Sequence, residues 1–288
     1  MIKYNPKNWF KLIFAIHKSD TLRIMWKELI YMGLFTLLVA FLEITYFPEA
    51  LLLKELIAVF SLVGFVISLL LVFRTNTAYD RWWEGRKKWG SLVNDTRNLA
   101  IKISVLIENE DDRQFFKRMI PNFVFATKEH LREGVLPEEL DLKDDELSIL
   151  ENKHIPNAIV KKLYERIARI KFSKEISDID YMVLDKNLNA LLDSLGACER
   201  IKNTPMPFSY NIFLKKFIFI YVSTLPLAFV TTFGYFSALI ATFVFYIFVS
   251  MEVLAEEIED PFGRDDNDLP TDNLSEKIKE NVSEIFDL

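Results

Sequence analysis

The residues best suited to chemistry are carboxylates near the end of the chain. Asp265, Asp266 and Asp268 lie in a stretch that reads DPFGRDDNDLP over residues 260–270. Carboxylate oxygens on a turn are hard ligands, and calcium takes about six to eight oxygens. Arg264 stands beside these acids and places a cation near any bound ion. The pattern therefore predicts a weak calcium site, or else an acidic turn that is only solvated.

A second stretch, residues 73–90, reads FRTNTAYDRWWEGRKKWG. It places one arginine and three tryptophans, Arg81, Trp82, Trp83 and Trp89, on one predicted helix, with acids within a turn of them. Arginine stacks on aromatic faces and pairs with carboxylates. We interpret the stretch as a structural joint, with a direct ion site as the alternative.

Other groups that carry chemistry are few. The histidines, His17, His130 and His154, are scattered without metal-ligand spacing, and the one cysteine, Cys198, cannot form an intrachain disulfide. There is no nucleophile motif and no phosphate-binding glycine loop. The net charge of −6 argues against a nucleic-acid partner. We expect a protein that is not an enzyme and requires no cofactor. A metal-dependent, membrane-bound hydrolase that uses the aspartates is the alternative.

Two apolar regions must position these groups. The first contains the spans 29–47 and 57–73, and the second is free of charge from Phe217 to Met251. A helix needs about 20 residues to cross the hydrocarbon of a bilayer, so the second region is too long for one span. Gly234 suits a tight reversal within it. The sequence predicts an all-α membrane protein with four transmembrane helices and a cytoplasmic helical domain.

Lysines and arginines crowd before the first span and after the second, while the loop between them offers only Lys54. Because positive charge stays on the cytoplasmic side, both termini and the middle region are expected there. The expected segments are an amphipathic start (1–28), spans one and two (29–73), a cytoplasmic helical domain (74–216), spans three and four (217–254) and an acidic cytoplasmic end (255–288).

Helical spacing of apolar residues continues through the middle region. We predict helices over 76–107, directly continuing the second span, over 111–133 with an interruption at Pro121, over 156–171 and over 178–202. The acidic segment 134–153 between them is predicted to be a surface loop.

A third stretch, NTPMPFSY over residues 203–210, precedes the third span. Together with the stretches 73–90 and 260–270, in this order around four spans, it resembles the bestrophin family, including its bacterial branch. The resemblance runs from about residue 5 to 275. It implies a homopentamer in the lipid bilayer that conducts small monovalent ions, chloride in the animal relatives and cations as an option for a bacterial member. It implies the inner (plasma) membrane as its location.

The resemblance also implies roles for single residues. Phe65, Leu69 and Phe73 are spaced by four on one helical stripe, and the matching family positions line an apolar pore neck. Leu69 stands where animal relatives have phenylalanine. Met206, between two prolines, matches a cytosolic aperture. From the residues alone, packing or contact with lipid is the favoured interpretation of the stripe, and a turn between helices is the favoured interpretation of Met206.

The acidic stretch resembles the calcium clasp of animal relatives. By this resemblance Asp265 and Asp268 would supply side-chain ligands, and Glu257 and Asp260 backbone carbonyls. Arg264 could pair with Glu257 or Asp260 and leave such a clasp usable. A secondary transporter is a third possibility, but the inverted repeats and broken helices typical of transporters are not evident.

Overall fold

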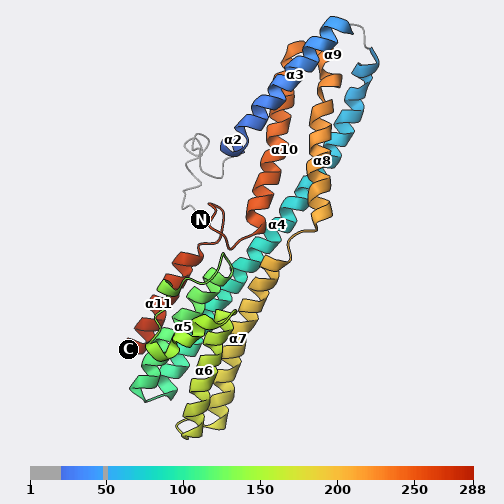
Figure 1. The fold of residues 1–288 in the computed structure, drawn as a ribbon. Coiled ribbons are helices and arrows are strands. Elements are labelled where there is room, and N and C mark those ends of the chain that lie inside the picture. The colour runs from blue at the N-terminus through green and yellow to red at the C-terminus, as the bar shows by residue number, and fades with distance from the viewer. Residues whose placement is uncertain (1–20, 48–50) are drawn as a thin grey trace. The chain divides into compact units, whose positions relative to one another are not determined.

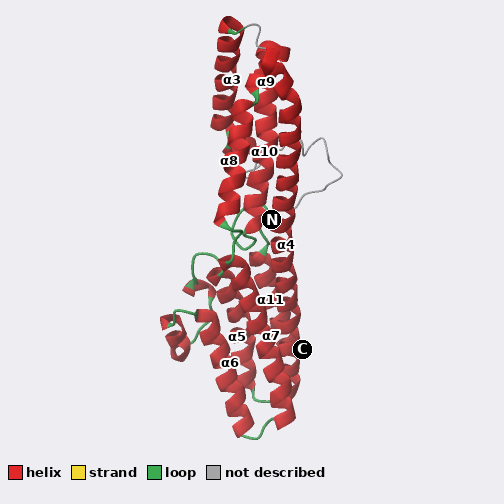
Figure 2. Ribbon diagram, turned by 90° about the vertical axis from the view of Figure 1, so that its right-hand side faces the viewer, coloured by secondary structure: helices red, strands yellow, loops and turns green. Residues whose placement is uncertain are grey.

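The computed structural model describes residues 21–47 and 51–288 (Figure 1). Residues 1–20 of the predicted amphipathic segment (1–28) lie outside the described residues. Helices follow one another along the described chain, and no strand occurs within it (Figure 2), so the all-α prediction is confirmed there. The helices are α2 (Thr21–Ile24), α3 (Trp26–Tyr46), α4 (Leu51–Leu106), α5 (Glu110–His130), α6 (Ile155–Phe172), α7 (Asp178–Asn203), α8 (Phe208–Thr224), α9 (Pro226–Phe233), α10 (Ser237–Glu259) and α11 (Thr271–Asp287), with 3₁₀ turns η1 (Pro137–Glu139), η2 (Asp144–Glu151) and η3 (Gly234–Phe236).

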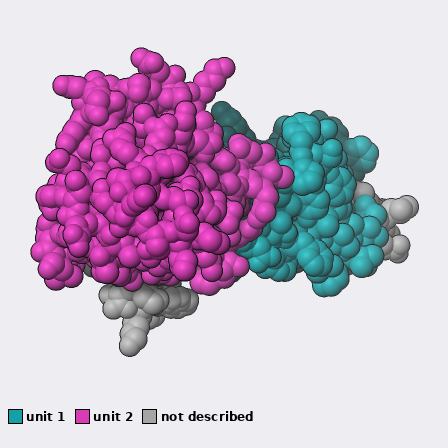
Figure 3. Space-filling view, turned by 90° about the horizontal axis from the view of Figure 1, so that it is seen from below, with its two compact units in different colours: residues 1–81, 205–259, 265–267 teal, residues 82–204, 260–264, 268–288 magenta. Residues whose placement is uncertain are grey.

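The chain divides into two units (Figure 3). The first unit comprises residues 1–81, 205–259 and 265–267, and the second comprises 82–204, 260–264 and 268–288. The units divide after residues 81 and 204, whereas the sequence-based segments divide after residues 73 and 216. The second span and the predicted helix 76–107 form the single helix α4, which confirms their direct continuation and carries the chain from the first unit into the second.

The first unit packs one face of α4 against α8 and α10. Ile67 and Leu71 of α4 are buried there with Leu214 and Ile218 of α8. Tyr221 of α8 reaches the backbone of α4, where its hydroxyl donates to the carbonyl of Phe60 at 3.1 Å. Gly64 makes this approach possible, because a Cβ there would lie 2.6 Å from the Tyr221 oxygen. Small residues that let helices approach closely are typical of packing between transmembrane helices.

The chain reverses direction between α9 and α10, as predicted. Gly234 ends α9 at a φ of 52°, in the left-handed region that glycine adopts without steric cost. Lys215 in the middle of α8 pairs with Glu256 near the end of α10 at 3.0 Å, and Tyr221 near the end of α8 lies against Phe248 in the middle of α10, with ring centroids 5.8 Å apart. These pairs show that α8 and α10 are antiparallel (Figure 1).

By length and composition, three helical stretches in the described chain could cross a membrane: Trp26–Tyr46, Leu56–Leu106 and Phe208–Glu259. The third contains α8, α9 and α10, and so includes the reversal at Gly234. The predicted count of four spans follows only if the two antiparallel arms of this stretch each cross.

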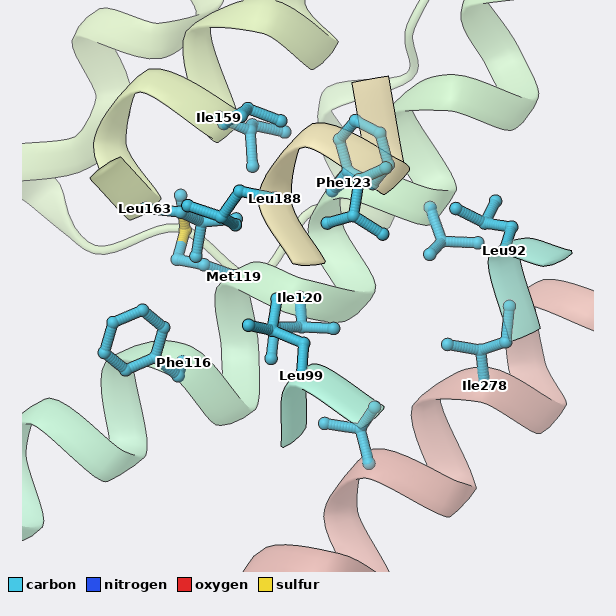
Figure 4. Close-up of a cluster of buried hydrophobic side chains, with 14 of the residues drawn as sticks. Leu92, Leu99, Phe116, Met119, Ile120, Phe123, Ile159, Leu163, Leu188 and Ile278 are labelled. Carbon is cyan, nitrogen blue, oxygen red and sulfur yellow. The ribbon is translucent and has the colours of Figure 1, made fainter. Parts of the chain in front are cut away.

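The second unit is a helical bundle with a continuous apolar core. Phe116, Phe123, Leu163, Leu188 and Ile278 lie in it, contributed by α5, α6, α7 and α11 (Figure 4). The helices α6 and α7 begin and end within one residue of the predicted ranges 156–171 and 178–202. Burial of this apolar area is the dominant stabilising contribution to such a bundle.

Two sequence-based interpretations of the second unit need correction. The helix α5 runs through Pro121 without a break, since the residues around this proline are buried on every side. The segment 134–153 is not a plain surface loop. It contains η1 and η2, it buries Ile149, and its Glu146 is held by two hydrogen bonds from Arg118 at 2.8 and 2.9 Å.

The acidic segment 255–288 at the end of the chain contains the 17-residue helix α11, where no helix was predicted. Ile278, Val282 and Phe286 are spaced by four on one face of this helix and are buried. That spacing was available in the sequence and predicts an amphipathic helix.

Candidate functional site

The predicted neck stripe lies on the exposed face of α4. Phe65, Leu69 and Phe73 are 66%, 45% and 57% exposed, whereas Ile67 and Leu71 on the opposite face are almost fully buried. The helix thus turns one apolar face into the first unit and presents another apolar face outward. A large uncovered apolar surface marks contact with lipid, with another protein chain or with a dry pore.

Arg74 follows the last stripe residue directly and is 1% exposed. Its Nη2 donates to Oε2 of Glu259 at 2.6 Å, and its Nε lies 3.7 Å from Oε2 of Glu252. These two carboxylates are seven residues apart, two turns of α10, and so lie on the same face of that helix. A buried guanidinium needs such partners, because removing its charge from water is costly without them.

Glu259 also holds the connection between α7 and α8. Its Oε1 accepts the backbone N–H of Met206 at 2.6 Å, and its carbonyl accepts from Nε of Arg81 at 3.1 Å. The Sδ of Met206 lies 2.8 Å from Nη1 of Arg74. We call these residues, with Glu252, the Arg74 network. The half-buried Met206 side chain is therefore directed at the guanidinium of Arg74 in the same chain.

The arginine-tryptophan stretch crosses from the first unit to the second within α4. Trp89 is 1% exposed in the apolar core of the second unit. Trp82 and Trp83 stack with ring centroids 6.4 Å apart, and neighbouring Glu84 pairs with Arg200 of α7 at 2.5 Å. These contacts are those of packing and pairing inside the protein.

The four predicted clasp residues are divided between the units. Glu257 and Asp265 belong to the first, and Asp260 and Asp268 to the second. The Glu257 side chain accepts from Nδ2 of Asn267 at 2.6 Å, while the Asp260 side chain accepts from the N–H of Phe262 at 3.4 Å.

Asp265 is exposed and Asp268 is 2% exposed. Across the described chain, these acids do not form a group of three carboxylates at metal-binding spacing. Any calcium site here would depend on backbone carbonyls for most of its ligands.

Arg264 does not pair as expected. Its Nη2 contacts Oε2 of Glu129 at 3.2 Å, instead of Glu257 or Asp260. Glu129 is buried on α5, 135 residues away in the sequence.

Glu129 belongs to a charged cluster that fastens the chain terminus to α5. Arg132 donates to the carbonyl of Phe262 at 3.2 Å and to Asp272 at 2.7 Å. The hydrogen bond from Arg132, followed by that from Lys128, lowers the pKa of Asp272. A depressed pKa means that this contribution to stability is present above the usual pKa of an aspartate and is lost as the pH falls through the lowered value.

The structure also brings together groups that the sequence left apart. His130 and His154 both contact Glu199, although their spacing had indicated no common site. Sequence analysis also missed Arg74, Glu252 and Glu259 as a unit. A signal was present, since these charges adjoin the apolar runs and a charge in that position requires a partner.

Comparison with known proteins identifies a family and several relatives that this chain resembles. The family model described as "Bacterial/Fungal Bestrophin protein" matches residues 1–284. The voltage-dependent anion channel-forming protein alr2987 of Nostoc is 35% identical over 98% of this chain and 93% of its own length. YneE of Escherichia coli K12, with the same description, is 32% identical over 100% and 94%. A bacterial bestrophin homologue from Klebsiella pneumoniae has a TM-score of 0.83 at 28% identity, over 91% of this chain and 98% of its own.

The Arg74 network generates a prediction about stability. Arg74→Met should lower the free energy of unfolding in mixed detergent micelles by about 3–5 kcal/mol, because it leaves two carboxylates buried without their cation. In a double-mutant cycle with Glu259→Gln, the coupling should be about 1–3 kcal/mol.

The exposed pair of Arg200 and Glu84, at side-chain exposures of 65% and 37%, provides the control. Its cycle of Arg200→Met with Glu84→Gln should give a coupling below about 1 kcal/mol. Equal couplings in the two cycles would contradict the assignment of Arg74 as a buried ion-pair centre.

Proposed function

Because the chain belongs to the bacterial and fungal bestrophin family, we propose that it conducts small monovalent ions through a pore formed by several copies of itself. The family and its curated relatives are channels, so the protein is a channel protein and not a hydrolase. The observation that carries the pore assignment is the outward apolar stripe of Phe65, Leu69 and Phe73 on α4.

We propose five copies, as the resemblance implies. One copy leaves the stripe uncovered, and rotation of several copies about one axis would turn the same stripe of each toward a common lumen. Each copy would then cross the membrane four times, through α3, the first part of α4, α8–α9 and α10. Both termini would lie in the cytoplasm. The inner membrane is the corresponding location.

Rings of apolar side chains would form the neck. Such rings conduct when they are wet and block when they exclude water, so their width sets the conductance. No charged residue lies between Ile57 and Phe73, and Arg74 is turned away into its network. The neck would therefore control ion passage by size and wetting, without a ring of charge.

The second constriction has two candidates. Met206 is the family-based one, and the network holds its backbone in one position through Glu259. The other candidate is the α6–α7 end of the second unit, where Phe172, Ile179 and Met182 are 84%, 74% and 71% exposed. Uncovered apolar groups of this kind fit a ring better than a side chain already in contact with Arg74.

We also propose that the acidic stretch 260–270 binds calcium weakly. Pairing of Arg264 with Glu129 draws its cation toward α5, which favours binding through Asp265 and Asp268. The shortage of converging carboxylates opposes tight binding.

Native mass spectrometry of the protein in mild detergent should give a species of five subunits. A species of monomers alone would exclude a shared pore, whereas a closed ring of another number would contradict only the pentamer.

Purified protein in a planar bilayer under a salt gradient should give single-channel currents. The names of the relatives favour a reversal potential at the chloride equilibrium potential. A reversal potential at the cation equilibrium potential would assign cation conduction instead, which the net charge of −6 would favour if the acids face the pore and concentrate cations there. Complete absence of current across these conditions would count against a channel.

Alanine at Phe65, Leu69 or Phe73 should raise the conductance or the open probability, since a wider apolar ring excludes water less strongly. Leu38→Ala on α3, where Leu38 is 55% exposed, removes a similar apolar group elsewhere and should leave the currents unchanged. Currents equal to those of the native protein in all three stripe variants would mean that the stripe faces lipid.

Calcium titration by calorimetry should give a dissociation constant on the order of 10⁻⁴ M or weaker. Asp265→Asn combined with Asp268→Asn should weaken binding at least tenfold, or about 1.4 kcal/mol, while Asp266→Asn should change it little. Binding that survives the double substitution undiminished would exclude these two aspartates as ligands.

A further inference from the structure

Three side chains from three separate segments of the second unit converge on one point. His130 is the last residue of α5, His154 immediately precedes α6, and Glu199 lies near the end of α7. Each histidine places its Nε2 2.8 Å from Oε1 of Glu199, and the two rings lie with centroids 4.4 Å apart. Within residues 21–47 and 51–288, no other three potential metal ligands of this kind meet so closely.

We propose that His130, His154 and Glu199 bind a zinc ion. Two imidazole nitrogens and one carboxylate oxygen form a ligand set that suits Zn²⁺, with bonds of about 2.0–2.2 Å. The ligand atoms already lie within 4.8 Å of one another. Tetrahedral coordination needs them about 3.3 Å apart, so the contacts of 2.8 Å would open by only a few tenths of an ångström.

The site keeps one position open to solvent. The side chains of His130, His154 and Glu199 are 28%, 34% and 27% exposed, which allows the ion to enter and a water molecule to complete its coordination. Imidazole ligands select zinc and similar transition metals over calcium, which prefers oxygen ligands alone. The site is therefore chemically distinct from the acidic stretch 260–270.

The protons on His154 must rearrange when the metal binds. In the metal-free protein its Nδ1 accepts the backbone N–H of Asn157 at 3.3 Å, so its Nε2 carries the proton and donates to Glu199. Metal binding through Nε2 moves that proton to Nδ1 and gives up the capping hydrogen bond. This bond is long and Asn157 is exposed, so its N–H can turn to water.

The helix dipoles of two of the three segments, α5 and α7, favour a bound cation at this site. His130 and Glu199 lie in the last turns of α5 and α7, where the helix dipole presents its negative end. His154 caps the positive end of α6, which opposes the ion. Lys202 lies nearby, and its ammonium is held by the carbonyls of Leu131 and Arg132. A bound ion would tie together the end of α5, the start of α6 and α7.

The test uses full-length protein without a polyhistidine tag, treated with a chelator and dialysed. Zinc titration followed by metal analysis should give one ion per chain, and cobalt should give the intense visible absorption of a tetrahedral site. Glu199→Gln and His154→Asn should each weaken zinc binding at least tenfold, since removing even an outer partner of a metal site costs about 10–100-fold. The asparagine keeps a cap for α6, so this variant retains the local fold.

His17→Ala serves as the control for adventitious binding to a histidine, and excess calcium should not displace zinc. Stoichiometric zinc that persists unchanged in the double variant His130→Ala/His154→Asn would overturn the proposal. The proposal would equally fail if the native protein bound no zinc, or if cobalt gave only the weak absorption of an octahedral ion.

Discussion

The guanidinium of Arg74 sits one residue beyond the apolar stripe of α4 and is enclosed by protein. A charge in that position cannot remain alone, because its desolvation is compensated only by close carboxylates and further hydrogen bonds. Glu252 and Glu259 meet that requirement from α10. Their pairing fixes the register between α4 and α10, so the direction in which the stripe residues point depends on it. The outward direction of the stripe is thus determined by the contacts on the buried side of the helix.

Glu259 also holds together the region where the apolar helices end. Glu259 accepts from Arg74 and from the backbone of Met206 with its side chain, and from Arg81 with its carbonyl. The end of α10, the connection before α8 and the arginine-tryptophan stretch are therefore held by one residue within the first unit. In the proposed pore, a small rotation of α4 at this point would alter the width of every apolar ring at once.

The second unit follows a different principle. Its apolar core is continuous, and its charges gather where chain segments meet: Arg132 and Lys128 at α11, Arg118 at η2, and the two histidines with Glu199. Each of these clusters joins segments that are distant in sequence. The helical bundle would form from burial alone, and the charged clusters select one arrangement of its loops and of its terminal helix.

The sequence by itself determined the local features of this protein. Runs without charge located the apolar helices, helical spacing located α6 and α7, and Gly234 located the reversal, because each of these depends only on residues within a few turns. Motif order was enough to identify the family. Only the tertiary structure decided which distant groups meet. Arg74 is paired across 185 residues of sequence, His130 and His154 share Glu199, Arg264 turns to Glu129, and segment 134–153 buries Ile149. Periodicity reveals which face of a helix is apolar, but the partner of a buried charge is set by how the helices pack around it.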